Sequence, residues 1–92
     1  MRYNLVDLKQ FVAVADAGSV SRGAQACFLA PSSASLRIKA LEDSLGAPLF
    51  VRQARGVSLT RPGQIMLEHC RRCLAELEQM HASLAPYGRG VK

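Results

Sequence analysis

Residues 31–52 read PSSASLRIKALEDSLGAPLFVR, and this stretch decides the fold. Pro31 suits the first position of a helix, where its missing N–H costs nothing, and Gly46 suits the position just after the last turn. Between them, apolar residues recur at the three- and four-residue steps of a helix with one buried face. The predicted inward positions are Ala34, Ile38, Leu41 and Leu45. We therefore predict a helix over 31–45 whose other face, rich in hydroxyls and bases, is presented to a partner.

A different pattern follows this helix. Residues 48–52 and 57–59 are short apolar runs, and a polar connection over 53–56 separates them. Two such runs joined by a glycine-containing turn predict a β-hairpin. Gly56 is the position where we expect a positive φ.

Two shorter helices are predicted upstream. Residues 4–17 place apolar side chains on one face, and Gly18 is a typical helix-ending residue. Ser19 is suited to cap a second helix over 20–28, and a short turn at 29–30 leads into the next helix. The inward positions expected on these two helices are Leu5, Leu8, Phe11, Val12, Ala15, Ala24, Cys27 and Phe28.

A long helix is predicted after the hairpin. Thr60 is suited to cap it, and it should run to about Ala85, just before Pro86. Apolar residues on it alternate at three- and four-residue steps, which is typical of a helix that pairs with another helix. The predicted dimerisation residues are Leu67, Cys70, Leu74, Leu77, His81 and Leu84.

This order of elements predicts a mainly α fold. It is a winged helix-turn-helix of three helices and a β-hairpin wing, followed by a long dimerisation helix. We expect the winged helix-turn-helix to occupy residues 1–61, the linker helix 62–86, and a hinge or tail 87–92. A chain of 92 residues, 49% of them hydrophobic, is enough for one small core.

The distribution of charge indicates a polyanionic partner. The net charge is +5 and the isoelectric point about 9.6. Between residues 22 and 61 the only acids are Glu42 and Asp43. The basic residues of that stretch are Arg22, Arg37, Lys39, Arg52, Arg55 and Arg61. A basic centre between more mixed ends predicts a basic face of the kind that contacts duplex DNA.

The helix at 31–45 is predicted to be the recognition helix. Its first residues would face base edges in the major groove, where serine hydroxyls can donate or accept hydrogen bonds. Arg55 at the hairpin tip would reach a narrow A·T-rich minor groove, and the other basic residues would contact phosphates. The predicted DNA-contacting residues are Ser19, Arg22, Pro31, Ser32, Ser33, Ser35, Leu36, Arg37, Lys39, Arg52, Arg55, Thr60 and Arg61.

Each of these residues also has an interpretation without DNA. The serines are also compatible with ordinary exposed helix positions, Arg37 and Lys39 with a solvated face, and Arg52 with an internal ion pair. The alternative function is a helix-mediated interaction or dimerisation module whose basic face is incidental. Steep salt dependence of binding distinguishes the two, and the wing favours DNA because a dimerisation module has no need of one.

The remaining sequence features exclude other classes of function. Three cysteines without a secretory signal indicate a reducing cytoplasm, and no apolar run approaches the ~18 residues of a membrane helix. His69, Cys70, Cys73 and His81 raise the alternative of a metal or redox site, but one continuous helix supplies too few ligands for structural zinc. We therefore expect no metal and no cofactor. We also expect no enzymatic activity, since no nucleophile stands beside an acid–base pair.

Three motifs run without gaps from about residue 5 to 63. They are Leu5-x-x-Leu8-x-x-Phe11-x-x-Val14-Ala15 with Gly18-Ser19 and Ala24, then Ser35-x-x-Ile38-x-x-Leu41-Glu42-x-x-Leu45-Gly46-x-x-Leu49-Phe50-x-Arg52, and finally Leu59-Thr60-x-x-Gly63. In these motifs the chain resembles the LysR-type transcription regulators, and the long helix is similar to their linker helix.

The resemblance implies a mode of DNA binding. Pro31, Ser32, Ser35 and Leu36 would face the major groove, and Arg55 the minor groove. Linker helices would pair antiparallel across a two-fold axis, so that a homodimer binds an interrupted palindrome. A tetramer of the full-length protein is left open.

The sequence also departs from the family. Ala30-Pro31-Ser32 stands where members usually have Ser-Gln-Pro, which removes a helix cap and a base-reading glutamine. Leu36 stands where many members carry arginine. Members also have a C-terminal effector-binding domain, so we expect this chain to be part of a longer protein, with any small-molecule effector bound outside it.

Overall fold

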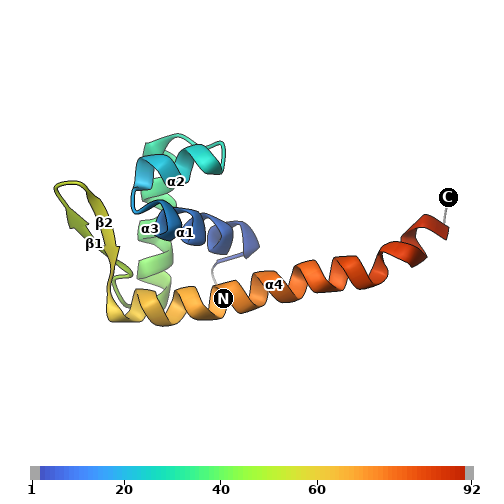
Figure 1. Ribbon diagram of the computed structural model, residues 1–92. Helices are drawn as coiled ribbons and strands as arrows, with labels where there is room; N and C mark the ends of the chain where they lie inside the picture. The colour runs from blue at the N-terminus through green and yellow to red at the C-terminus, as the bar shows by residue number, and fades with distance from the viewer. Residues whose placement is uncertain (1–2, 91–92) are drawn as a thin grey trace.

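Six elements follow one another along residues 3–90, the part of the chain that the computed structural model describes. They are α1 (Leu5–Ala17), α2 (Val20–Ala26), α3 (Pro31–Leu45), β1 (Phe50–Gln53), β2 (Gly56–Leu59) and α4 (Arg61–Gly90). The three short helices and the hairpin form a head from which α4 extends, so the molecule measures 52 × 24 × 21 Å (Figure 1). The predicted winged helix-turn-helix with a long terminal helix is confirmed.

Reciprocal hydrogen bonds hold the start of α1. Asn4 Oδ1 accepts the Asp7 N–H (3.1 Å), and Asp7 Oδ2 accepts the Asn4 N–H (3.0 Å), which makes a capping box. The helix buries Val14, against which Gly23 of α2 packs so closely that a Cβ there would lie 2.5 Å from it. The expectation that Leu5 faces the core is wrong, because this packing turns the Val14 side of α1 inward.

The turn between α2 and α3 begins earlier than predicted. The N–H groups of Phe28 and Leu29 donate to the carbonyls of Gln25 (3.1 Å) and Ala24 (2.9 Å), so α2 ends at Ala26. Phe28 adopts a left-handed conformation with φ of 58°, and its side chain is 96% exposed. The prediction that Phe28 faces the core is therefore wrong.

The wing is anchored to the turn between α1 and α2. Gln53 pairs with Gly56, which leaves Ala54 and Arg55 at the tip. Gly56 has a φ of 133°, as predicted, and a Cβ there would overlap the carbonyl oxygen of Gly18. The next N–H of β2 donates to that same oxygen (3.0 Å). A close backbone contact therefore fixes where the wing stands on the head.

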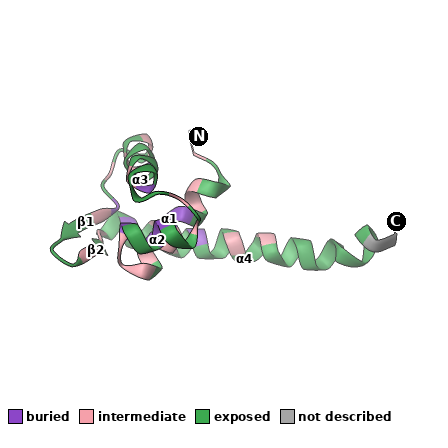
Figure 2. Cartoon of the chain, turned by 90° about the horizontal axis from the view of Figure 1, so that it is seen from above, coloured by how far each residue is buried: buried purple, intermediate pink, exposed green. Residues whose placement is uncertain are grey.

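The core lies among α1, α2 and α3 of the head, and α4 adds Cys70 to it (Figure 2). The rings of Phe11 and Phe50, 5.2 Å apart between centroids, join α1 to β1. The buried hydrophobic residues are Phe11, Val14, Val20, Ala24, Ala34, Ile38, Leu41, Leu49 and Cys70. The predicted inward positions of α3 are confirmed except for Leu45. That residue is partly exposed, because it lines the rim between the end of α3 and α4.

α4 does not end before Pro86. It continues to Gly90, and its last turns, drawn in red, bend away from the rest of the helix (Figure 1). The predictions of a helix end at Ala85 and of an irregular tail from Tyr87 are therefore wrong. A proline inside a helix removes one hydrogen bond and crowds the preceding turn, and a bend relieves this crowding without ending the helix. Residues 91–92 of the predicted tail lie outside the described residues.

Replacing Gly63 by alanine should destabilise the head. The new Cβ would overlap the carbonyl oxygen of Leu49, and over-packing of this kind costs about 1–3 kcal/mol. Urea unfolding followed by circular dichroism measures this loss. Gly88→Ala on the same helix is the matched control, since a Cβ there meets nothing within 4 Å. The control should keep or raise stability, and equal midpoints for the two variants would contradict the close contact at Gly63.

Candidate nucleic-acid interface

The start of α3 is presented to solvent. Its cap position, Ala30, makes no side-chain hydrogen bond, as expected from the departure at this site, and Pro31 occupies the first turn. Helical spacing places the polar residues of α3 opposite the buried Ala34 and Ile38. The predicted contact residues that are exposed on α3 are Pro31, Ser32, Ser33, Leu36, Arg37 and Lys39. Ser35 is half-buried because it faces the wing.

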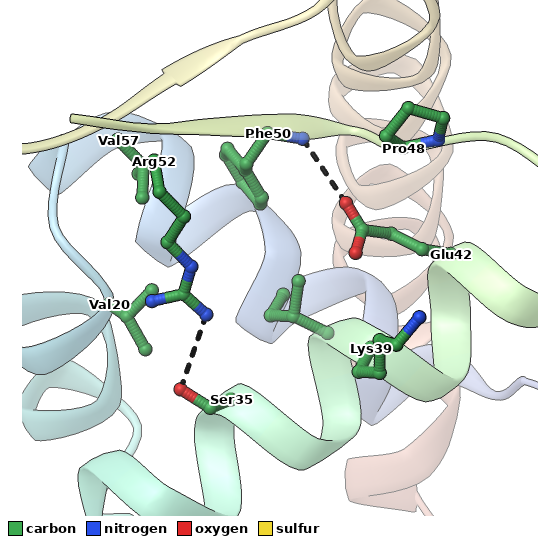
Figure 3. Close-up of a pocket in the computed structure, with 9 residues that line it drawn as sticks. Val20, Ser35, Lys39, Glu42, Pro48, Phe50, Arg52 and Val57 are labelled. Carbon is green, nitrogen blue, oxygen red and sulfur yellow. Dashed lines mark hydrogen bonds between the residues drawn. The ribbon is translucent and has the colours of Figure 1, made fainter.

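A hollow of about 200 Å³ separates α3 from β1 (Figure 3). Apolar side chains, including Val20 and Phe50, line it together with the polar Ser35, Lys39 and Arg52. Arg52 reaches from the strand towards α3, and its Nη2 donates to Ser35 Oγ (3.5 Å). The internal ion pair considered for Arg52 does not form with any carboxylate among residues 3–90; the guanidinium instead links the wing to α3.

The two cations of α3 are held by carboxylates of the same chain. Arg37 Nη1 lies 3.4 Å from Asp7 Oδ1, and Lys39 Nζ lies 3.0 Å from Asp43 Oδ1. The hydrogen bond to Asp43, together with its charge, raises the pKa of the Lys39 amine. Exposed pairs of this kind are weak in water, so a phosphate can replace either carboxylate. Each pair uses only part of the hydrogen-bonding capacity of its cation, so Arg37 and Lys39 can contact DNA either with the remaining N–H donors or by exchange of partners.

Besides Arg52, three of the cations predicted to contact DNA have no carboxylate partner within the described part of the chain. Arg22 lies at the start of α2, where Ser19 Oγ accepts its backbone N–H (3.2 Å), and Arg55 lies at the tip of the wing. Arg61 begins α4, and its Nη1 donates to Gln64 Oε1 (3.4 Å). All three side chains are exposed. They are therefore the cations most readily offered to phosphates.

Thr60 has a role inside the fold. Its Oγ1 accepts the Gly63 N–H (3.0 Å), which caps α4 as predicted, and donates to the carbonyl oxygen of Pro48 (2.6 Å). Its only hydroxyl hydrogen is thus donated within the head, and the DNA contact expected of Thr60 stays a prediction.

The first part of the predicted dimerisation seam belongs to the head. Leu67 packs against the core, and Cys70 is 3% exposed beneath α1. The prediction that Cys70 lies in a dimer seam is wrong, because a residue covered within its own chain has no surface left for a partner. Burial, and next the nearby Cys73, raise the pKa of the Cys70 thiol.

Within residues 3–90, no three His, Cys, Asp or Glu side chains gather to hold a metal, and no helix is long and apolar enough to cross a membrane.

The second part of the seam lies open. Leu74, Leu77 and His81 of α4 line a hollow of about 380 Å³ together with Leu5 of α1. Further along the helix, Leu84 is exposed. Within the described part of the chain, Leu74 and Leu77 of this apolar stripe on α4 are half-buried, whereas His81 and Leu84 are exposed. Leu5, expected in the core, therefore joins this surface instead.

Two carboxylates that position α3 were missed by the sequence reasoning. Asp7 joins the cap of α1 to Arg37, and Glu42 Oε2 accepts the N–H groups of Leu49 (2.7 Å) and Phe50 (3.3 Å). The spacing of a capping box could have identified Asp7. No local signal identifies the bonds of Glu42, since its partners lie beyond the turn that ends α3.

Comparison with known proteins identifies relatives of this arrangement. The family described as bacterial regulatory helix-turn-helix protein, lysR family, matches residues 5–64. The HTH-type transcriptional regulator TfdT of Cupriavidus pinatubonensis is 40% identical over 83 residues, which cover 90% of this chain and 36% of TfdT. The activator AllS of Klebsiella pneumoniae is 39% identical over 85 residues, 92% of this chain and 32% of AllS. The chain thus spans about a third of the length of these relatives.

Solved structures share the fold. The DNA-binding domain of CbnR, in complex with DNA, is 32% identical with a TM-score of 0.82, over 95% of this chain and 99% of that one. The BenM DNA-binding domain in complex with benA site 1 DNA is 28% identical with a TM-score of 0.88, over 96% of this chain and 99% of that one.

Replacing Thr60 by alanine separates its structural role from a role in binding. We expect a loss of about 1–2 kcal/mol in the free energy of unfolding, because the cap and its second hydrogen bond are lost. The affinity of the folded variant for DNA, measured by fluorescence anisotropy, should equal that of the unchanged chain. Ser58→Ala, at an exposed position of β2, serves as the control for stability. Weaker DNA binding by fully folded Thr60→Ala would show that Thr60 also contacts DNA.

Proposed function

Because the chain belongs to the lysR family of bacterial regulatory helix-turn-helix proteins, we propose that it binds duplex DNA as a homodimer and regulates transcription. The observation that carries the proposal is the exposed, serine-bearing start of α3 beside a wing whose tip presents Arg55. Small side chains let a helix approach base edges closely in the major groove. The crystal structures of the CbnR and BenM domains, whose fold this chain shares, contain these domains in complex with DNA.

The proposed contacts divide into positioning and selection. Arg22 and Arg61, at the starts of two helices, contact phosphates, and these contacts set register but carry little sequence information. Ser32 and Ser33 supply single hydroxyls to base edges, which discriminate less than a two-bond contact. Arg55 enters a minor groove, where a narrow A·T-rich stretch attracts a cation.

A second copy of the chain is the proposed occupant of the apolar stripe on α4. An isolated helix gains too little from its own hydrogen bonds to be stable, so the exposed half of α4 needs a partner. Antiparallel pairing through Leu74, Leu77, His81 and Leu84 buries this stripe and fills the hollow beside Leu5. Two recognition helices related by a two-fold axis then select DNA with the same symmetry.

Effector binding, the place of action and the competing function complete the proposal. The chain spans about a third of the relatives' length, so we place the binding of any small-molecule effector in the rest of a full-length protein. We also propose that the regulator acts in the cytoplasm, where its DNA is. An interaction module with an incidental basic face is the competing function, and the salt dependence of binding separates the two.

DNA affinity should fall steeply with salt. The slope of log K against log salt should be about −0.9 per phosphate neutralised, and Arg61→Ala, which removes a proposed phosphate contact, should make it less negative by about 0.9. Anisotropy titrations with A·T-flanked duplexes at several salt concentrations measure both. Arg72→Ala, which removes a cation paired with Glu68 on α4, is the matched control and should keep the slope. A slope near zero for the unchanged chain would favour the interaction module.

Replacing Leu77 by aspartate should weaken dimers and, through them, DNA binding. A carboxylate buried without a partner costs several kcal/mol, so we expect a dimer at least about tenfold weaker. Sedimentation equilibrium measures the dimer, and anisotropy measures the DNA affinity. Ala75→Asp places the same charge on an exposed position two residues away and should change neither. An unaltered dimer for Leu77→Asp would refute this seam.

A further inference from the structure

One apolar side chain stands at the centre of the exposed face of α3. Leu36 is 71% exposed, although it lies in the helix that supplies three residues to the core. Helical geometry places it one turn after Ser32 and Ser33, and one turn before Ala40, all of them small and exposed. An isobutyl group therefore projects beyond its neighbours on this face.

The base-reading half of α3 has no side chain that can make two hydrogen bonds to one base. Guanine is usually read by arginine or lysine and adenine by asparagine or glutamine. Residues 31–36 contain none of these. The next two cations, Arg37 and Lys39, are held by Asp7 and Asp43. Within residues 31–36, the serine hydroxyls and the apolar Pro31 and Leu36 remain as the groups that can distinguish base pairs, and Leu36 is the longer of the two apolar side chains.

The major groove offers one apolar feature to such a side chain. It is the methyl group on C5 of a pyrimidine, which thymine carries and which methylation adds to cytosine. Contact between a leucine and that methyl removes apolar surface from water on both sides. Guanine, adenine and unmodified cytosine carry no methyl group at their major-groove edges, so a leucine buries less apolar surface against them.

Resting on the proposed DNA binding, we propose that Leu36 is a specificity-determining residue that reads the C5-methyl group of a pyrimidine in each half-site. Thymine and 5-methylcytosine satisfy it, whereas cytosine and uracil do not. A methyl group buried in this contact corresponds to about a fourfold difference in affinity per half-site. The operator should accordingly contain one thymine, at the same place in both halves, whose methyl is required.

Deoxyuridine substitution tests this inference, because it removes only the methyl of thymine. A bound sequence is first selected from random duplexes with the unchanged chain. Each thymine is then replaced by deoxyuridine in turn, and affinity is measured by anisotropy at fixed salt. We expect one position per half-site to lose about fourfold, and Leu36→Ala to abolish that loss while keeping other base preferences.

The same position tests cytosine methylation. With the thymine replaced by cytosine, adding the 5-methyl group should recover about fourfold for the unchanged chain and nothing for Leu36→Ala. Val6→Ala removes an exposed apolar side chain of α1 and is the matched control, which should respond to both modifications as the unchanged chain does.

The outcomes separate this inference from the proposed function. Equal sensitivity of Leu36→Ala and the unchanged chain to every deoxyuridine would overturn the role of Leu36 while sequence-selective DNA binding stands. Failure to select any sequence, with affinity independent of the duplex used, would overturn the proposed function as well.

Discussion

The backbone of Leu49 connects the parts of this molecule that must act together. Its N–H donates to Glu42 at the end of α3, and its carbonyl oxygen accepts the Thr60 N–H at the start of α4. Its side chain is buried in the core, and Gly63 packs directly on its carbonyl. α3, the wing and α4 are thereby held in one geometry. A dimer can meet two half-sites only if this geometry does not vary.

The proposed interface separates affinity from selection. Arg22, Arg55 and Arg61 lack carboxylate partners among residues 3–90, whereas the bases of α3 already have them. A cation that leaves its own carboxylate to bind a phosphate gains less binding free energy than a cation that had no partner before. The unpartnered cations therefore contribute most of the electrostatic attraction to DNA. The centre of α3 is left to hydroxyls and Leu36. A helix with this composition favours discrimination by methyl groups and DNA shape over hydrogen-bond pairs.

The first turns of α4 and its later turns contribute to two different surfaces. Its first turns complete the core through Leu67 and Cys70, and its exposed half carries the stripe proposed for a second copy. Leu5 of α1 stands at the boundary, because it lines the hollow beside Leu74. The burial of Cys70, which raises the pKa of its thiol, also favours a packing role over redox chemistry.

The sequence by itself determined the order and type of the elements. Their signals are local: Ser19 and Thr60 cap helices, Gly18 and Gly46 end them in left-handed conformations, and the period of apolar residues changes at the wing. The exposed start of α3 followed from the same periodicity, because the face opposite Ala34 and Ile38 carries mainly polar residues.

Only the tertiary structure decided which apolar side chains are covered and which charges are paired. Leu5 and Phe28 fit an apolar pattern yet lie outside, while Cys70 was assigned to a partner and lies inside. Periodicity gives the width of an apolar stripe, but the crossing of neighbouring helices sets which part of that stripe is buried. The contacts of Asp7 with Arg37 and of Ser35 with Arg52 join residues 30 and 17 positions apart. Such pairs exist only once the chain has folded, because no local spacing brings them together.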